Sequence, residues 1–202
     1  MDWLIIVAVA AVVLIALGWW LSYTAARLHR MHTRVEGALA ALDAYLIRRA
    51  ESTMALAVSG ALDPASSLLL ADAASDSLEA TTTGAGVADL LEGQRFGDRA
   101  EVESHLTEAL RLALPDEVVR EIHDTGGPDA EAVQRLHDAS VRLQMARSFH
   151  AETVAEATRL RRQPFVRVFR LAGHAAWPLV IEFDDALPEG LENWPTLGPV
   201  TP

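Results

Sequence analysis

The sequence predicts an all-α protein, in which a single N-terminal transmembrane helix continues into an antiparallel four-helix bundle with a proline-rich acidic tail. Three observations predict this class. Residues 3–21 form one uninterrupted apolar run. Apolar residues then recur with helical spacing, and no region before the tail shows the alternation typical of a strand. We therefore expect an anchor over residues 1–26, a bundle over residues 27–177 and a tail over residues 178–202.

The apolar run is long enough to cross a bilayer as one helix. It has 19 residues, all apolar or glycine, and no charged residue lies between Asp2 and Arg27. Its helical rise of about 28 Å approaches the hydrocarbon thickness of a membrane. Aromatic side chains favour membrane interfaces, and they stand at both ends of the run: Trp3 at one end, and Trp19, Trp20 and Tyr23 at the other.

Two alternatives to a transmembrane helix are open. A buried core helix fits poorly, because the run is apolar on every side and the remaining chain could hardly enclose it. A cleaved signal peptide would have a basic start and a shorter apolar run, whereas this chain begins Met1-Asp2. The sequence therefore favours an uncleaved anchor.

Flanking charge predicts the orientation of the anchor. Only Asp2 precedes the run, while Arg27, Arg30 and Arg34 follow it. Basic residues next to a span tend to stay on the cytoplasmic side. We therefore expect a single-pass protein of the cell membrane, with the N-terminus outside and the bundle in the cytoplasm. The opposite topology is the alternative.

The first long helix should leave the membrane without a break and extend over residues 27–59. Gly60 then favours a helix end, and Asp63-Pro64 favours a new start, with Asp as the cap and Pro in the first turn. One face of this helix carries apolar residues three and four positions apart: Val35, Leu39, Leu42, Leu46, Ala50, Met54 and Ala57.

Three shorter helices are expected in the middle of the chain, over residues 64–81, 99–114 and 115–123. The threonines and glycines between the first two predict a loop, with one helical turn at residues 87–91. The apolar residues assigned to these helices are Leu68, Leu69, Ala71 and Leu78 in the first, and Val102, Leu106, Ala109, Leu110 and Ala113 in the second.

The second long helix is expected over residues 128–162, and a short helix should follow over residues 165–172. The tail holds five of the nine prolines, which predicts an extended or disordered segment. Residues 180–183 could still dock there as a short strand. The apolar stripe of the long helix consists of Leu136, Ala139, Leu143, Ala146, Phe149, Val154, Ala157 and Leu160.

Composition excludes several classes of protein. All 17 basic residues are arginine, and there is no cysteine. Without lysine there is no phosphate-binding loop of the Walker type and no Schiff base. Without cysteine there is no disulfide, thiolate zinc site, iron–sulfur cluster or thiol nucleophile. The net charge of −11 argues against nucleic acid as the main partner.

The uneven distribution of charge predicts a second membrane contact. Residues 63–131 carry a net charge of −12, and residues 132–177 a net charge of +5. In an up-down bundle the fourth helix returns to the membrane that the first one leaves. Arginines interleaved with large apolar residues there suit anionic lipid at the inner leaflet. The residues assigned to the membrane interface are Trp3, Trp19, Trp20, Arg27, Arg30, Arg34, Arg162, Phe165, Arg167, Phe169, Arg170 and Trp177.

Each charged region also has a plainer interpretation. Phe165, Val168, Phe169 and Leu171 would cap the bundle core if the neighbouring arginines are simply solvated. The acidic middle of the chain would be a solvated face rather than a docking surface for a basic partner.

No pattern points to a catalytic, cofactor or metal site. Di-iron bundles need Glu-x-x-His, whereas Glu101 and His105 are four residues apart and Glu121 and His123 are two apart. No Gly-x-Ser-x-Gly nucleophile element occurs. We therefore expect no enzymatic activity, no cofactor and no metal, and we expect His150 to be packed or hydrogen-bonded.

Two stretches and the order of elements resemble the LemA family of bacterial membrane proteins. The first stretch is similar to the family's first long helix and comprises Val35-Glu36-Gly37-Ala38, Ala41-Leu42-Asp43, Leu46 and Arg48-Arg49. The second is similar to its last helix and comprises Ala146-Arg147-Ser148-Phe149-His150, Val154 and Arg161-Arg162-Gln163-Pro164. Residues 171–173 and 178–183 stand where the family has a glycine-aromatic element and an aromatic-acidic ending. The resemblance implies a four-helix bundle at a membrane, no accepted enzymatic activity and no catalytic residues.

These features predict a scaffold or protein-interaction module at the cytoplasmic face of a bacterial membrane. The expected partners are the lipid bilayer, with anionic lipid as one candidate, and either another protein or a second copy of the chain. The alternative is an envelope-facing domain of opposite topology that binds or senses a ligand. An enzyme with an unrecognised site is a third class.

Overall fold

The computed structural model describes residues 2–83, 96–169 and 177–194, and within them the chain is all-helical with no strand. This confirms the all-α class. The helices are α1 (Asp2–Ala57), α2 (Pro64–Thr83), α4 (Phe96–Ala113), α5 (Asp116–Thr125), α6 (Gly127–Arg161), α7 (Pro164–Val168) and α8 (Glu189–Glu192). The helical turn expected at residues 87–91 lies outside the described residues.

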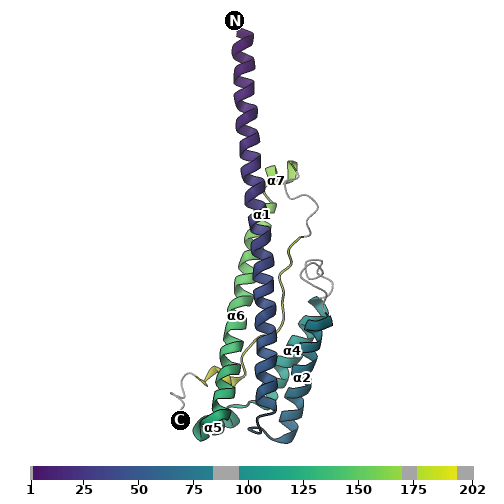
Figure 1. Ribbon diagram of the computed structural model, residues 1–202, viewed down its shortest axis with the longest axis vertical. Helices are drawn as coiled ribbons and strands as arrows, with labels where there is room; N and C mark the ends of the chain where they lie inside the picture. The colour runs from purple at the N-terminus through teal and green to yellow at the C-terminus, as the bar shows by residue number, and fades with distance from the viewer. Residues whose placement is uncertain (1, 84–95, 170–176, 195–202) are drawn as a thin grey trace.

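Helix α1 is the axis of the molecule (Figure 1). Its 56 residues extend over about 84 Å, and its first part projects beyond every other element. The rest of α1 packs against α6 and against α2. The predicted stripe is buried from Val35 to Ala57, with Met54 partly buried, because apolar residues at this spacing share one helix face.

The chain reverses after α1 at the turn that the sequence predicts. Gly60 has a φ of 89°, a conformation that glycine adopts without the steric cost of a side chain. The Asp63 carboxylate accepts hydrogen bonds from the backbone N–H groups of Ala65 and Ser66, at 2.9 and 3.2 Å. These bonds satisfy donors at the start of α2, which then runs back along α1.

Helices α2 and α4 pack together beside the end of α1 farther from its N-terminus. The part of the body where α2 and α4 lie is here called the distal half. The buried face of α2 consists of Leu70, Ala74 and Ser77. Leu68 and Leu69, two of the apolar residues assigned to this helix, are exposed. Three consecutive leucines fit three helix phases, and tertiary packing selects the third. The predicted face of α4 is confirmed by the burial of Leu106, Ala109, Leu110 and Ala113.

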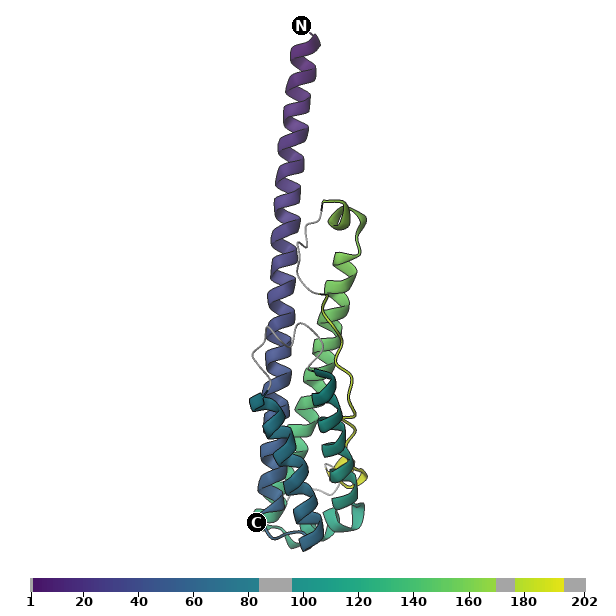
Figure 2. The same cartoon turned by 90° about the vertical axis from the view of Figure 1, so that its right-hand side faces the viewer.

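Helix α6 runs back along α1, past the ends of α2 and α4 (Figure 2). Its predicted stripe is buried at most positions, but Phe149 is exposed and His150 is buried in its place. Leu143, His150 and Ala157 are seven residues apart and share one buried face. From Ala146, the next position on the buried face is four residues on, at His150, and not three residues on, at Phe149. The assignment of Phe149 to the buried stripe is therefore wrong.

The helices that contribute to the core differ from one end of the body to the other. Its largest cluster lies in the distal half and combines residues of α1, α2, α4, α5, α6 and α8. The cluster nearest the projecting part of α1 contains residues of α1 and α6 alone: Met31, Val35, Val154, Ala157 and Leu160. The four long helices therefore lie side by side only in the distal half, and α1 and α6 continue as a helix pair toward α7 (Figure 2).

The described part of the tail, residues 177–194, is extended up to the short helix α8. It runs along the seam between α4 and α6: Thr107 of α4 donates to the carbonyl of Asp184 at 2.6 Å, and Gln144 of α6 donates to that of Asp185 at 2.8 Å. Residues 180–183 form no strand. Side chains of the tail fill the core at Ile181, Leu191 and Trp194.

Candidate membrane interface

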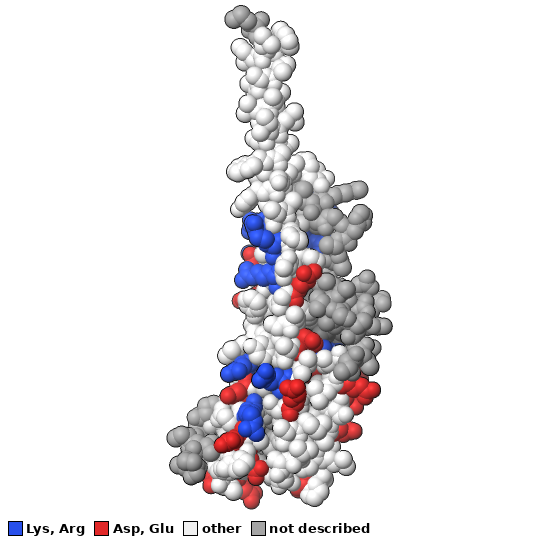
Figure 3. Space-filling model, in the orientation of Figure 1, with Lys and Arg blue, Asp and Glu red and all other residues white. Residues whose placement is uncertain are grey.

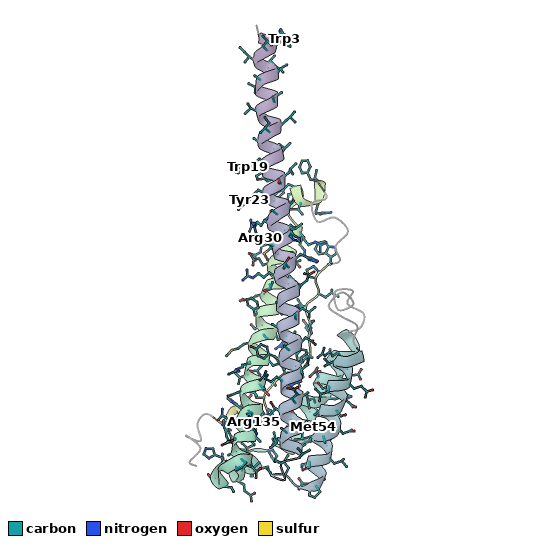
Figure 4. All side chains as sticks on the ribbon, viewed as in Figure 1. Trp3, Trp19, Tyr23, Arg30, Met54 and Arg135 are labelled. Carbon is teal, nitrogen blue, oxygen red and sulfur yellow. The ribbon has the colours of Figure 1, made fainter. Side chains whose placement is uncertain are left out.

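The projecting part of α1 presents apolar side chains on all sides (Figure 4). Trp3, Trp19 and Trp20 are exposed, as are the aliphatic residues between them. This helix is long and apolar enough to cross a membrane, a property that signal sequences share. The apolar run itself, residues 3–20, contributes no side chain to the core, which excludes the alternative of a buried core helix for this run. Apolar surface of this extent is costly in water.

Helix α7 begins beside the last turn of the apolar run. The ring of Phe165 lies 4.7 Å from the ring of Trp20, centroid to centroid, with the planes tilted by 54°. Val166 is buried at the same place. The C-terminal end of α6 and the following helix are thereby held where α1 leaves the body of the protein (Figure 1).

Two large apolar side chains at the end of α7, beyond the buried Val166, are exposed rather than packed. Val168 is 74% exposed and Phe169 47%, and so the interpretation of these two residues as a cap on the core is wrong. Phe165 is partly buried against Trp20. Leu171 and Arg170 lie outside the described residues. On the other side of that gap, Trp177, Leu179 and Val180 are exposed as well.

The arginines assigned to the interface fall into two groups. Arg27 and Arg30 of α1, Arg162 directly after α6 and Arg167 of α7 are exposed. Arg30 follows Tyr23 along α1 (Figure 4). Arg34 lies about 20 Å beyond Leu21 along α1 and is engaged with α6. Its guanidinium lies 5.6 Å from the Phe149 ring centroid and 3.7 Å from the Glu156 carboxylate.

Arg161 and Trp177 join α6 to the tail at this end. The guanidinium carbon of Arg161 lies 4.6 Å from the ring centroid of Trp177, a cation–π contact. Burial lowers the pKa of Arg161 below its ordinary value. The contact holds the exposed Trp177 ring against the last turn of α6, close to α7.

A buried charged network in the distal half was missed by the sequence analysis. The Arg49 guanidinium donates to the Glu103 carboxylate at 2.7 Å, to the Glu103 carbonyl at 3.1 Å and to the Thr107 hydroxyl at 3.1 Å. The other carboxylate oxygen of Glu103 accepts from Ser77 at 2.8 Å. Arg99 donates to Asp43. The network joins α1, α2 and α4.

One signal for this network was present in the sequence. Arg49 follows Leu46 by three residues and precedes Thr53 by four, so it stands on the buried face of α1. Glu103 likewise precedes Leu106 by three residues on α4. Charged residues on a buried face must find partners there, because burial of an unpaired charge is strongly unfavourable.

The tail is fixed by charge as well as by packing. Arg147 binds both carboxylate oxygens of Asp185, at 2.5 and 2.8 Å, and Arg111 binds Asp184 at 2.6 Å. Burial raises the pKa of Asp184, but hydrogen bonds from the Ala186 N–H group and from Arg111 outweigh it, and the pKa lies below its usual value. Both aspartates therefore act as anionic anchors for the tail.

His150 is packed, as expected, with 2% of its surface exposed. Its Nδ1 has no hydrogen-bond partner among the described residues. Burial lowers the pKa of His150 below its ordinary value and favours the neutral ring. Among the described residues, no group of three or more His, Cys, Asp or Glu side chains is placed to hold a metal ion.

Comparisons with protein-family models, with curated proteins and with solved structures gave no match to this chain.

Proposed function

We propose that this protein is a membrane-anchored scaffold, with α1 as a single uncleaved span and a second contact with the bilayer at α7. The observation that carries the proposal is the contact of Phe165 with Trp20. It places exposed Val168 and Phe169 next to the end of the apolar run, where a membrane surface would cover them. Two attachment points would hold the helix pair α1–α6 upright on the membrane.

The proposed orientation has the N-terminus outside and the body in the cytoplasm. Arg27 and Arg30 follow the run, and Arg162 and Arg167 are exposed near its end. Each arginine close to an anionic leaflet contributes about 1 kcal/mol of attraction. We therefore expect anionic lipid, rather than neutral lipid, to hold the α7 end. An envelope-facing domain is the outcome if the topology is reversed.

A protein-interaction role fits the distal half better than catalysis does. Four helices, an antiparallel arrangement and a tail sealed into the seam would make the distal half a rigid body about 30 Å long, estimated from the 20 residues of α2. Arg49, Glu103 and Ser77, all buried in the distal half, bind one another. We propose that this body presents its surface to a protein partner.

Distant membership of the LemA family is part of the same proposal. The two resembling stretches lie on α1 and α6, which pack against each other. Arg49, in the first stretch, is a buried member of the charged network. These placements support a common framework, in which the resemblance reflects packing rather than an active site.

Topology is tested most cheaply with single cysteines, because the chain has none. Val58 is exposed at the distal end, and Val58→Cys should be protected from a membrane-impermeant maleimide in intact cells and labelled after lysis. A cysteine placed before Trp3 should show the opposite pattern. Labelling of Val58→Cys in intact cells would overturn the cytoplasmic scaffold and favour the envelope-facing domain.

A further inference from the structure

Helices α1 and α6 form an open basic groove in the distal half. It has a volume of about 300 Å³, and its lining includes Arg48 and Ala55 of α1 and Arg135, Ala139 and Arg142 of α6. All three arginines are exposed. Among the described residues, no ion pair within 4 Å involves Arg48 or Arg142, and Arg135 is 3.8 Å from Glu131. Glu51 and Asp138 offset part of the charge, and the groove keeps a positive excess.

An acidic stripe lies on the exposed side of α2. Leu68, Asp72 and Asp76 are four residues apart, so they share one face of the helix, and all three are exposed. On neighbouring α4, Glu101 and Glu108 are exposed too. Arg99 of α4 is held in the interior, while Arg111 of α4 is exposed and pairs with Glu108 at 3.2 Å. Asp72, Asp76 and Glu101 therefore give this surface its acidic character.

The groove and the stripe flank α1 on different sides. In Figure 1, α6 lies on one side of α1, and α2 and α4 lie on the other. In Figure 3 the basic side chains of the distal half gather over α1 and α6, and acidic side chains line the opposite edge. One copy of the protein therefore carries both complementary surfaces, facing in different directions.

The two surfaces also lie at the same height. Arg48 precedes the end of α1 by nine residues, or about 14 Å. Asp72 and Asp76 follow the start of α2 by eight and twelve residues, or about 12 and 18 Å. The end of α1 and the start of α2 are joined by the short turn at the distal end. The distances of Arg48, Asp72 and Asp76 therefore share this turn as their reference point.

We propose that copies of this chain associate side by side in the membrane, with the acidic stripe of α2 of one copy in the basic groove of its neighbour. The inference rests on the anchoring in the proposed function, because a shared bilayer gives all copies one direction and one depth. The surfaces differ, so the contact is heterologous and extends into rows or rings instead of closing as a two-fold pair. Exposed ion pairs are weak, and confinement to the membrane favours their formation.

Charge exchange between two tagged, co-expressed full-length copies tests this contact. One copy carries Ala55→Cys in the groove, and the other carries Ser75→Cys beside the stripe. A short bis-maleimide applied to membranes should link the two tags. Arg48→Glu/Arg142→Glu in the first copy, or Asp72→Arg/Asp76→Arg in the second, should lower the linked fraction about tenfold, since attraction becomes repulsion. Both reversals together should restore it.

A matched control separates the contact from a general effect of charge. Glu117→Arg/Glu121→Arg on α5 makes the same change in net charge as Asp72→Arg/Asp76→Arg, at two other exposed positions, and should leave the linked fraction unchanged. The proposal is overturned if single reversals have no effect, if the double reversal does not restore linking, or if copies link mainly through identical positions.

Alkaline carbonate extraction of the same membranes reports on the anchoring separately. Protein that resists extraction but fails the charge exchange retains its anchor and loses the proposed contact. Protein that is released but passes the charge exchange keeps the contact and overturns the anchor. Circular dichroism melts of each variant identify any reversal that simply unfolds the protein.

Discussion

Arg49 of α1 and Glu103 of α4 form a buried ion pair at 2.7 Å, with 2% and 0% of their side-chain surfaces exposed. The Thr107 hydroxyl of α4 accepts a further hydrogen bond from Arg49, and the Ser77 hydroxyl of α2 donates one to Glu103. Because two desolvated charges must meet in one geometry, the pair fixes how α1, α2 and α4 register against one another.

Removal of one partner of this ion pair should be costly. Glu103→Gln leaves Arg49 as an uncompensated buried charge, and we expect a loss of about 3 kcal/mol in the free energy of unfolding. The measurement is urea unfolding in detergent micelles, followed by circular dichroism. Glu101→Gln, exposed on the same helix, is the control and should change stability by less than about 0.5 kcal/mol. Equal unfolding curves for the two variants would contradict the role of the network.

The docking of α8 on α5 should be sensitive to one methyl group. A Cβ at Gly190 would lie 2.6 Å from Cγ2 of Val119 and 3.1 Å from the carbonyl oxygen of Leu114. Gly190→Ala should therefore displace α8, with a loss of about 1–3 kcal/mol and faster proteolysis of the tail. Val119→Ala should relieve part of the effect.

Gly37→Ala is the matched control for this substitution. A Cβ at Gly37 meets nothing within 4 Å, and alanine favours a helix by up to about 1 kcal/mol. The same chemical change should thus stabilise α1 and leave proteolysis of the tail unaltered. If Gly190→Ala is as benign as Gly37→Ala, the tail does not dock as described.

His150 should make stability depend on pH. Burial lowers the pKa of the folded protein's ring below the unfolded value of about 6.5. As the pH falls through that value, the unfolded chain binds a proton that the folded protein does not, and stability decreases. The full free energy of unfolding is therefore reached only above the pKa of His150 in the unfolded chain. His150→Leu should reduce the dependence of the urea unfolding midpoint on pH between pH 7.5 and 5.5. His105→Leu, at an exposed position, should leave that dependence unchanged.

The helical class and much of the core could be predicted because they follow from local periodicity. The stripe of α1, the break at Gly60 and the cap at Asp63 are all short-range features. The position of Phe149 and the phase of the leucines at 68–70 could not be predicted in the same way. There the neighbouring residues are equally apolar, and contacts from other helices decide which side chain is buried.

The candidate membrane interface and the buried charged network also differ in whether short-range sequence features could predict them. Flanking arginines and aromatic rings led to the prediction of an interface at the α7 end, because such residues are favoured at membrane surfaces. The partners of Arg49 are more than 50 residues away in sequence, as the span to Glu103 shows. Hydrogen-bond partners at such separations are set by the packing of whole helices. The ion pairs that fix the tail could not be predicted for a similar reason, because the anchoring residues Arg111 and Arg147 lie on two different helices.

The central claim is that the α7 end lies on the membrane while the distal half stays in water. Val168 and Val58 provide a matched pair, since each is 74% exposed and they stand at opposite ends of the body. The full-length protein with either Val168→Cys or Val58→Cys is labelled with a polarity-sensitive fluorophore and reconstituted into vesicles containing anionic and spin-labelled lipid. The account predicts strong quenching by lipid at position 168 and none at position 58. Equal quenching at both positions, or none at position 168, would contradict it.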